Sequence, residues 1–424
     1  MTSLLNKIFS FSKNFDQKNF SFVDLRNDKS VSLLFSAIES YSQTSEIRYV
    51  GGCIRKILNK ETIQDIDFAV NLKPNECIEA LKKNNIKYYE TGLEHGTITA
   101  TIENNKYEIT SLRKDILTDG RHAKVEFSNN WFEDASRRDF TINSIYSDID
   151  GNLYDPFNGR IDLQLGKVEF IGDTEKRIKE DYLRILRYIR FFLNYSKQEH
   201  SDEVKRIIKK NISGISKISS ERLLDEFQKI IKSKGFLKLF KDSFCQEIIK
   251  LIFPQLNNFV IFKKLNSFAK KRISKVDYIF LISLMIIDDS DNVDYFIFKF
   301  NISNVNKKRI LFLKEFYSKN INKNFFSEKN LWKILYYNGK QSLLDLLHFE
   351  IFKSKNINDK LINLLNFFED KNVPIFPIKA KNLMVKYNVS EGQLLGIKLK
   401  EIEEKWINND FKISENEIAQ LLEN

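Results

Sequence analysis

The sequence of 424 residues contains few of the side chains that most often form cross-links or metal sites. Its three cysteines, Cys53, Cys77 and Cys245, have neither the pairing of a disulfide framework nor the close spacing of zinc ligands. This usage is typical of a reducing compartment, and we expect a cytoplasmic protein. The four histidines are scattered and none precedes an aspartate, which argues against a histidine–aspartate metal hydrolase.

Long apolar runs are also missing. Residues 278–287 are one of the longest uncharged apolar runs in the sequence. This run falls well short of the ~20 residues that a membrane-spanning helix needs. We therefore expect no membrane segment. Hydrophobic residues make up 42% of the chain, which supports globular folding, and the chain length predicts two or more packed units.

The net charge of +11 favours a polyanionic partner such as nucleic acid. Lysine, asparagine, isoleucine and phenylalanine are frequent along the whole chain, however, so charge alone is a weak indication. The partner has to be inferred from local motifs.

Glycine marks a change of structure along the chain, because most of the 14 glycines lie between Gly51 and Gly172 and few follow Gly235. Short β-rich runs alternate with helical stretches in the glycine-rich part. Asn104 and Asn105 are expected to form a hairpin turn between the last two runs. These β-rich runs are residues 47–50, 65–70, 97–103 and 106–112.

From Thr174 onward, apolar residues recur at three- and four-residue spacing, which predicts helices. The fold class expected is therefore α+β, with a mixed sheet and its helices first and an all-helical region after it. Clear helical segments are residues 221–231, 276–287, 331–337 and 361–368.

The first motif with chemical meaning is Gly51-Gly52, which follows an expected strand and opens an expected helix. Glycines at a helix start allow backbone N–H groups to approach a phosphate, and the helix dipole favours the negative charge. Arg55, in the first turn, could clamp a triphosphate.

Two aspartates follow one helix length later. Asp65 and Asp67 are two residues apart in an expected strand, so both carboxylates should point to one face. Two hard cations in one site need shared oxygen ligands of this kind. Glu108 on a neighbouring strand is the candidate third carboxylate, with Tyr107 and Ile109 facing the other side. The alternative is a solvated polar face.

Two further clusters combine arginines with aspartates. Arg137 and Arg138 could neutralise a triphosphate, and Asp139 could accept hydrogen bonds from ribose hydroxyls. Asp181 and Arg184 have the spacing of neighbours on one helical face, which Arg187 continues. Such a pair could read a base edge without a template, although a surface salt bridge is the commoner reason for this spacing.

These motifs occur together in an order that resembles the class II tRNA nucleotidyltransferase and bacterial poly(A) polymerase family, within the polymerase β-like superfamily. The resemblance is strong over residues 46–232 and weaker afterwards. Residues 91–99 and 108–113 resemble the CCA-adding branch, and residues 119–122 resemble a loop of that branch. Lys56 and Asn59 depart from the family pattern, where aspartate and glycine are usual. The motif residues are Gly51, Gly52, Arg55, Asp65, Asp67, Arg137, Arg138, Asp139, Phe140, Thr141, Asn143, Asp155, Pro156, Glu180, Asp181, Arg184 and Arg187.

The resemblance implies a division of the chain and a reaction. An N-terminal extension (1–45) would precede a nucleotidyltransferase head (46–160), a helical neck that recognises the base (161–235), and a helical body and tail that bind tRNA (236–424). The enzyme would add CCA to the 3′ end of tRNA from CTP and ATP, using Mg²⁺. Asp65 and Asp67 would bind the metal, and Glu108 would assist catalysis. The nucleotide would contact Gly51, Gly52, Arg55, Arg138, Asp139, Asn143, Asp181, Arg184, Arg187 and Arg190.

Three alternatives share much of this pattern. A poly(A) polymerase would use ATP alone, and the segment at residues 94–97 argues against it. An enzyme that adds only CC or only A would differ mainly in residues 115–122. A catalytically dead RNA-binding protein would be expected to lack one of the three carboxylates, and all three are present.

Overall fold

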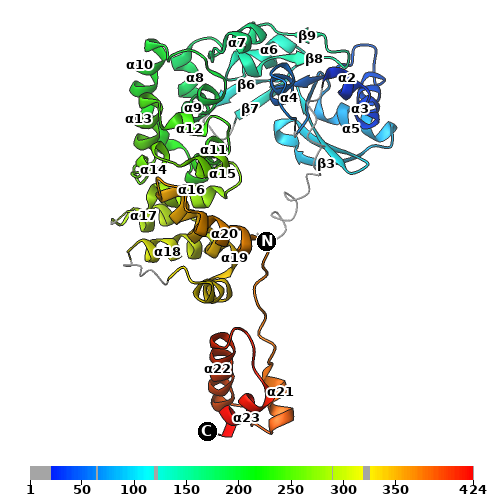
Figure 1. Ribbon diagram of the computed structural model, residues 1–424. Coiled ribbons are helices and arrows are strands. Elements are labelled where there is room, and N and C mark those ends of the chain that lie inside the picture. The colour runs from blue at the N-terminus through cyan, green and yellow to red at the C-terminus, as the bar shows by residue number, and fades with distance from the viewer. Residues whose placement is uncertain (1–20, 64, 119–122, 289, 319–324, 424) are drawn as a thin grey trace. The chain divides into compact units, whose positions relative to one another are not determined.

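The computed structural model describes residues 21–63, 65–118, 123–288, 290–318 and 325–423 (Figure 1). By its internal contacts the chain divides into two compact units, one that ends at Ile252 and one that begins at Phe253. Residues 1–20 of the expected N-terminal extension and residues 119–122 of the expected loop lie outside the described residues. The finer boundaries of extension, head, neck and body stay a prediction.

The first unit begins with a mixed sheet in the order β3-β4-β5-β2-β1-β8-β9, where β2 and β5 are parallel and the other neighbours antiparallel. A separate hairpin, β6-β7, follows the main run of strands. The strands are β1 (Ile47–Val50), β2 (Asp67–Val70), β3 (Lys87–Gly92), β4 (Thr97–Ile102), β5 (Asn105–Ser111), β6 (Arg113–Thr118), β7 (Ala123–Phe127), β8 (Tyr146–Ser147) and β9 (Leu153–Tyr154).

Two details of the strands differ from the sequence expectation. The strand expected at residues 65–70 begins only at Asp67, because the ladders of β2 with β1 and β5 reach no further. The hairpin turn is formed by Glu103 and Asn104, one residue earlier than expected. Glu103 takes a left-handed conformation (φ 55°), and Asn105 already pairs with Ile102 in the ladder.

Helices cover the sheet, and after β9 the regular elements formed by the described residues are all helices, as expected. The short helices η1, η2 and η3 are of the 3₁₀ type. The helices of the first unit are α2 (Phe22–Arg26), α3 (Lys29–Glu39), α4 (Gly52–Leu58), α5 (Pro74–Lys83), η1 (Leu93–His95), α6 (Trp131–Ser136), η2 (Thr141–Asn143), α7 (Gly159–Leu165), α8 (Thr174–Glu180), α9 (Arg184–Tyr195), α10 (Asp202–Asn211), η3 (Ile212–Lys217), α11 (Ser220–Ile231), α12 (Phe236–Leu239) and α13 (Ser243–Ile252).

Every helix or strand that the described residues of the second unit form is a helix, which confirms the expected α+β class. The segment expected at residues 276–287 is α16, and every residue of α16 after Tyr278 is buried. Gly339 interrupts α19 with a positive φ of 81°. The helices are α14 (Val260–Lys263), α15 (Ser267–Arg272), α16 (Tyr278–Ile286), α17 (Asn292–Lys299), α18 (Asn304–Ser318), α19 (Glu328–Lys353), α20 (Asp359–Glu369), α21 (Ala380–Tyr387), α22 (Gln393–Asn408) and α23 (Glu415–Glu423).

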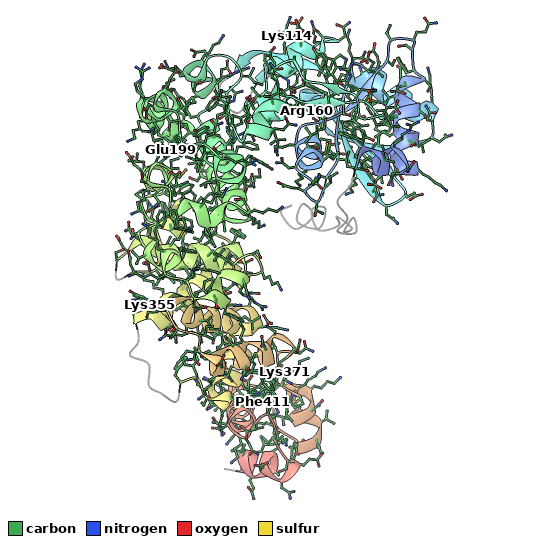
Figure 2. The ribbon with its side chains drawn as sticks, turned by 45° about the horizontal axis from the view of Figure 1, so that its top comes forward. Lys114, Arg160, Glu199, Lys355, Lys371 and Phe411 are labelled. Carbon is green, nitrogen blue, oxygen red and sulfur yellow. The ribbon has the colours of Figure 1, made fainter. Side chains whose placement is uncertain are left out.

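The last three helices form a small core of their own around Leu383, Leu395 and Ile402. Phe411, labelled in Figure 2, packs edge-on against Trp406 of α22 with ring centroids 4.9 Å apart. None of the helices formed by the described residues has the length and apolar character needed to span a bilayer.

The core of the sheet includes the helix that precedes it. Phe35 of α3 lies against Tyr49 of β1 and Phe68 of β2, with ring centroids 5.1 Å and 5.8 Å away. All three side chains are fully buried. The described part of the expected extension therefore contributes to the hydrophobic core that supports β1 and β2.

Adjacent leucines in α3 test this packing. Leu34 is fully buried and Leu33 is 43% exposed. We expect Leu34→Ala to reduce the free energy of unfolding of the first unit by about 3 kcal/mol, because the substitution leaves a cavity in the core. Leu33→Ala should cost less than about 1 kcal/mol. Denaturant unfolding followed by circular dichroism measures both, and equal effects would contradict the packing of α3 against the sheet.

Candidate active site

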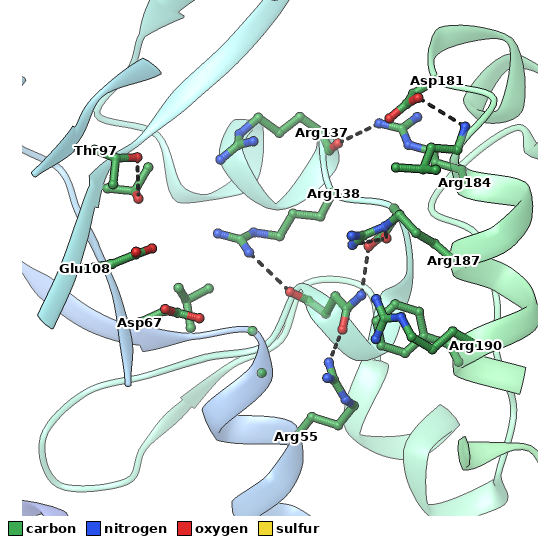
Figure 3. Close-up of a pocket in the computed structure, with 18 of the residues that line it drawn as sticks. Arg55, Asp67, Thr97, Glu108, Arg137, Arg138, Asp181, Arg184, Arg187 and Arg190 are labelled. Carbon is green, nitrogen blue, oxygen red and sulfur yellow. Dashed lines mark hydrogen bonds and ion pairs between the residues drawn. The ribbon is translucent and has the colours of Figure 1, made fainter. Parts of the chain in front are cut away.

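A cavity of about 650 Å³ in the first unit brings together residues that are far apart in the sequence (Figure 3). Its walls come from the sheet, from α4, from the segment between α6 and η2, and from α9 and α11. All but one of the predicted site residues line it, the exception being Asp65. Those that do are Gly51, Gly52, Arg55, Asp67, Glu108, Arg138, Asp139, Asn143, Asp181, Arg184, Arg187 and Arg190.

The two glycines form the start of α4 directly after β1. Gly51 has φ 69° and ψ −115°, a conformation that side chains rarely adopt, and a Cβ there would lie 3.6 Å from Nη1 of Arg138. A Cβ on Gly52 would meet nothing within 4 Å. The backbone at Gly52 is thus open to the cavity, as a phosphate-binding turn requires.

Two carboxylates lie side by side on the sheet. Asp67 of β2 and Glu108 of β5 are direct partners in the parallel ladder, so their side chains share one face. Tyr107 and Ile109 are buried on the opposite face, as expected. Figure 3 shows both carboxylates pointing into the cavity.

Asp65 does not lie on this strand face, and its predicted placement in the strand is wrong. It precedes β2, is exposed and does not line the cavity. Burial, followed by the negative charges of Glu108 and Asp65, raises the pKa of Asp67 to about 6. A site that gathers this much negative charge suits a divalent cation, for which carboxylate oxygens are the preferred ligands.

Asp139 connects the sheet region to α9. Its Oδ1 accepts hydrogen bonds from the Phe140 amide (2.9 Å) and from Asn143 Nδ2 (2.8 Å), and its Oδ2 accepts from Arg187 at 2.6 Å. Burial opposes ionisation of Asp139, but the charge of Arg187 and these hydrogen bonds outweigh it and lower the pKa to about 2. The carboxylate therefore stays charged at neutral pH.

Arg55 joins the same network. Its guanidinium donates to the side-chain oxygen of Asn143 and lies over the rings of Phe191 and Tyr195, with centroids 4.8 Å and 5.0 Å away. Only 7% of the residue is exposed. Arg55 thus packs α4 against α9 as well as lining the cavity.

Asp134, which was not predicted as a site residue, holds the two neighbouring arginines in place. Its carboxylate pairs with Arg137 at 2.8 Å and with Arg138 at 3.0 Å, and it accepts from the Tyr146 hydroxyl at 2.6 Å. Burial opposes ionisation, but the charges of Arg138 and Arg137 hold the pKa of Asp134 well below its ordinary value. The position of Asp134 three and four residues before Arg137 and Arg138 could have indicated these ion pairs from the sequence.

Asp181 and Arg184 both line the cavity, but the prediction that they share one helical face is wrong. Helix α8 ends at Glu180, Asp181 is extended (φ −151°), and α9 begins at Arg184. The Asp181 carboxylate accepts from the Leu183 amide (3.1 Å) and from Arg222 of α11 (2.8 Å). Arg184 instead pairs with Glu180 at 2.6 Å.

The remaining predicted arginine, Arg190, lies one turn beyond Arg187 on α9. It pairs with the buried Glu226 of α11 at 2.5 Å and stacks over Phe191 at 4.2 Å from the ring centroid. Arg222 and Glu226 were not predicted as site residues. Their position four residues apart on α11 places both toward α9.

The carboxylate cluster should destabilise the metal-free protein. Because folding raises the pKa of Asp67 from 3.8 to about 6, the folded state holds this proton more tightly, and stability is lost as pH rises through that range. In EDTA at pH 8, Asp67→Asn should therefore raise the free energy of unfolding by on the order of 1 kcal/mol, with a smaller gain at pH 5. Asp202→Asn, which changes a 97% exposed side chain of α10 outside the cavity lining, is the control. A destabilised Asp67→Asn protein at pH 8 would contradict the cost that burial and the neighbouring charges place on the ionised Asp67 carboxylate.

Comparisons with known proteins agree with this geometry. Residues 47–169 match the poly(A) polymerase head domain, and residues 201–260 match a probable RNA and SrmB-binding site of polymerase A. The CCA-adding enzyme of Bacillus stearothermophilus in complex with CTP has the same fold, with a TM-score of 0.69 at 20% identity over 92% of this chain and 96% of that chain. The Thermotoga maritima enzyme complexed with tRNA has a TM-score of 0.60 at 19% identity, over 95% and 97% of the two chains.

Proteins with similar sequences match either about half of the chain or nearly all of it. The CCA-adding enzyme of Lactobacillus johnsonii is 38% identical over 198 residues, which are 46% of this chain and 48% of that protein. The mitochondrial CCA tRNA nucleotidyltransferase 1 of mouse and that of human are each 30% identical, over 438 and 436 residues, and the matches cover 99% of this chain and 94% of each relative. By this near full-length identity, the chain belongs to the class II CCA tRNA nucleotidyltransferase family, which has the poly(A) polymerase head.

Proposed function

We propose that this protein adds the CCA sequence to the 3′ end of tRNA, taking the nucleotides from CTP and ATP without a nucleic-acid template. The observation that carries the proposal is the cavity itself, in which two carboxylates, an open glycine turn and the Asp181 and Arg184 side chains line one space. The relatives named above support tRNA as the acceptor.

Asp67 and Glu108 would bind Mg²⁺, with Asp65 joining from the segment before β2. The raised pKa of Asp67 supports this role, because a bound cation would offset the burial and the neighbouring negative charges that raise it. A Mg²⁺ ion held by these carboxylates would supply Lewis-acid chemistry, favouring deprotonation of an attacking hydroxyl and neutralising phosphate charge. The reaction would be attack of the RNA 3′-hydroxyl on the α-phosphate of CTP or ATP, with release of pyrophosphate.

The triphosphate would lie over Gly51 and Gly52, opposite Arg138. A Cβ at position 51 would come within 3.6 Å of the Arg138 guanidinium, so the glycine leaves room between the two walls. Asp134 fixes Arg138 through its carboxylate and thereby directs this positive charge. Arg55 would add charge to the same side, and Asp139 and Asn143 would contact the ribose.

The base would lie between Asp181 and Arg184. Cytosine and adenine both present an exocyclic amino group to an acceptor, whereas uracil and guanine present a carbonyl there. Asp181 would accept from the amino group and Arg184 would donate to a ring acceptor. Arg187 and Arg190, held by Asp139 and Glu226, would support the wall from which these residues project.

Residues 236–424 would hold the body of the tRNA, consistent with the division into head, neck, body and tail that we predict from the sequence. A cytoplasmic location is likewise a prediction from cysteine usage, and the mammalian relatives carry a mitochondrial name.

A direct assay tests the product. The protein is incubated with tRNA that lacks CCA, together with CTP, ATP or both, and the 3′ termini are sequenced. We expect CC from CTP alone and CCA from the two nucleotides together. A run of adenines would indicate a poly(A) polymerase, CC alone or A alone a partial enzyme, and no addition a catalytically dead RNA-binding protein. Each of these results would overturn the proposal.

Replacement of Asp181 should change nucleotide choice more than the rate of chemistry. Asp181→Ala removes the acceptor for the base amino group, so discrimination against UTP should fall by roughly ten- to hundredfold. The measurement is kcat/KM for CTP and UTP with the same tRNA. Asp202→Ala, which removes a 97% exposed side chain of α10, is the control. If kcat/KM fell equally for CTP and UTP, the role of Asp181 would be purely structural, through its ion pair with Arg222.

A further inference from the structure

A pair of threonine hydroxyls lies on the same sheet face as the carboxylates. Thr110 follows Glu108 by two residues on β5, so both side chains point into the cavity, about 7 Å apart along the strand. Thr97 of β4 is the ladder partner of Thr110, and the two hydroxyl oxygens are 3.1 Å apart. Both residues line the cavity, and Figure 3 shows Thr97 on the same side of the cavity as Glu108.

The neighbouring threonine on β4 behaves differently. Thr99 lies opposite Glu108, but its hydroxyl is 2.9 Å from that of Thr91, and Thr99 is not among the cavity residues. The Thr97 and Thr110 pair is therefore the hydroxyl pair that a substrate in the cavity could contact.

Strand order places Thr97 on the opposite side of the carboxylates from the glycine turn, and its partner Thr110 lies on β5, two residues beyond Glu108. The sheet runs β4-β5-β2-β1, so Glu108 and Asp67 lie on the two middle strands, Thr97 lies on β4, and the glycine turn follows β1. In phosphoryl transfer the attacking and leaving oxygens are roughly in line across the reacting phosphorus. If the triphosphate occupies the glycine side, the attacking 3′-hydroxyl must approach from the threonine side.

The chemistry of the pair fits a ribose hydroxyl. Of the two hydroxyl hydrogens, one is used in the Thr97–Thr110 hydrogen bond and the other can be donated to a ligand, while the oxygens retain lone pairs that can accept. A 2′-hydroxyl is both donor and acceptor, and it is the group by which proteins distinguish RNA from DNA. On the terminal ribose of the RNA, the 2′-hydroxyl is also the neighbour of the attacking 3′-oxygen.

We propose that Thr97 and Thr110 bind the 2′-hydroxyl of the last ribose of the RNA acceptor and so select RNA over DNA at the 3′ end. This inference rests on the proposed function. Arg113, three residues after Thr110, also lines the cavity and would supply positive charge for the adjoining phosphodiester.

The test combines protein and acceptor changes. Wild type and the Thr97→Val/Thr110→Val double variant are assayed for CTP addition to tRNA that lacks CCA and ends in either ribose or 2′-deoxyribose. Valine keeps the branched shape that strands favour. We expect wild type to lose roughly tenfold in kcat/KM for the deoxyribose acceptor, as expected for a hydrogen bond in the cavity. The double variant should be about tenfold slower with ribose and nearly indifferent to the sugar.

CTP affinity, measured by equilibrium binding without tRNA, should be the same in wild type and variant, because the pair lies on the acceptor side. Thr101→Val changes the same residue type on β4 outside the cavity lining and should match wild type in every measurement. Each single variant retains one of the two hydroxyls. If the double variant does not fold, the single variants replace it in the comparison of ribose and deoxyribose acceptors. Full sensitivity to deoxyribose in the variants, or none in wild type, would overturn the inference. Failure of wild type to extend tRNA would instead contradict the proposed function.

Discussion

The candidate site depends on the buried carboxylate of Asp139. One oxygen orders the turn that contains Asn143, and the other binds Arg187 of α9 at 2.6 Å. Asn143 in turn accepts from Arg55 of α4, whose first residues form the glycine turn. A single charge thus connects the glycine turn of the cavity to α9, the helix that follows Asp181. Removing one partner of such a network leaves the others buried without compensation, which is costly in a low-dielectric interior.

The parts of this arrangement that follow from local periodicity could be predicted from the sequence. Alternation along a strand placed Glu108 on one face and Tyr107 and Ile109 on the other, and the parallel ladder confirms it. Three- and four-residue spacing predicted α9, α11 and the buried α16. Motif order and family resemblance predicted which residues would meet in one cavity, because a shared fold preserves their positions although the chain separates them.

The parts that depend on distant partners could not be predicted. The helical pattern continues through residues 174–195 of the sequence, yet the helix is interrupted at Asp181. The carboxylate of Asp181 accepts hydrogen bonds from a backbone amide and from Arg222, 41 residues away. Asp65 lies just outside the ladders that fix Asp67. Cys245 lies beside His200 and Asp242, with ligand atoms within 4.8 Å of one another, although their spacing in sequence gave no indication of contact. Asp242 caps α13 through the Cys245 amide at 2.8 Å.

The parallel pairing of β2 with β5 also has a kinetic consequence. Asp67 and Glu108 are ladder partners, but helix α5 and two antiparallel strands intervene in the sequence. Parallel ladders close long loops and form late relative to local hairpins and helices. A chain that has formed only its local hairpins and helices lacks this pair of neighbouring carboxylates. If Asp67 and Glu108 serve nucleotide transfer as proposed, transfer requires a chain that has already completed this parallel ladder.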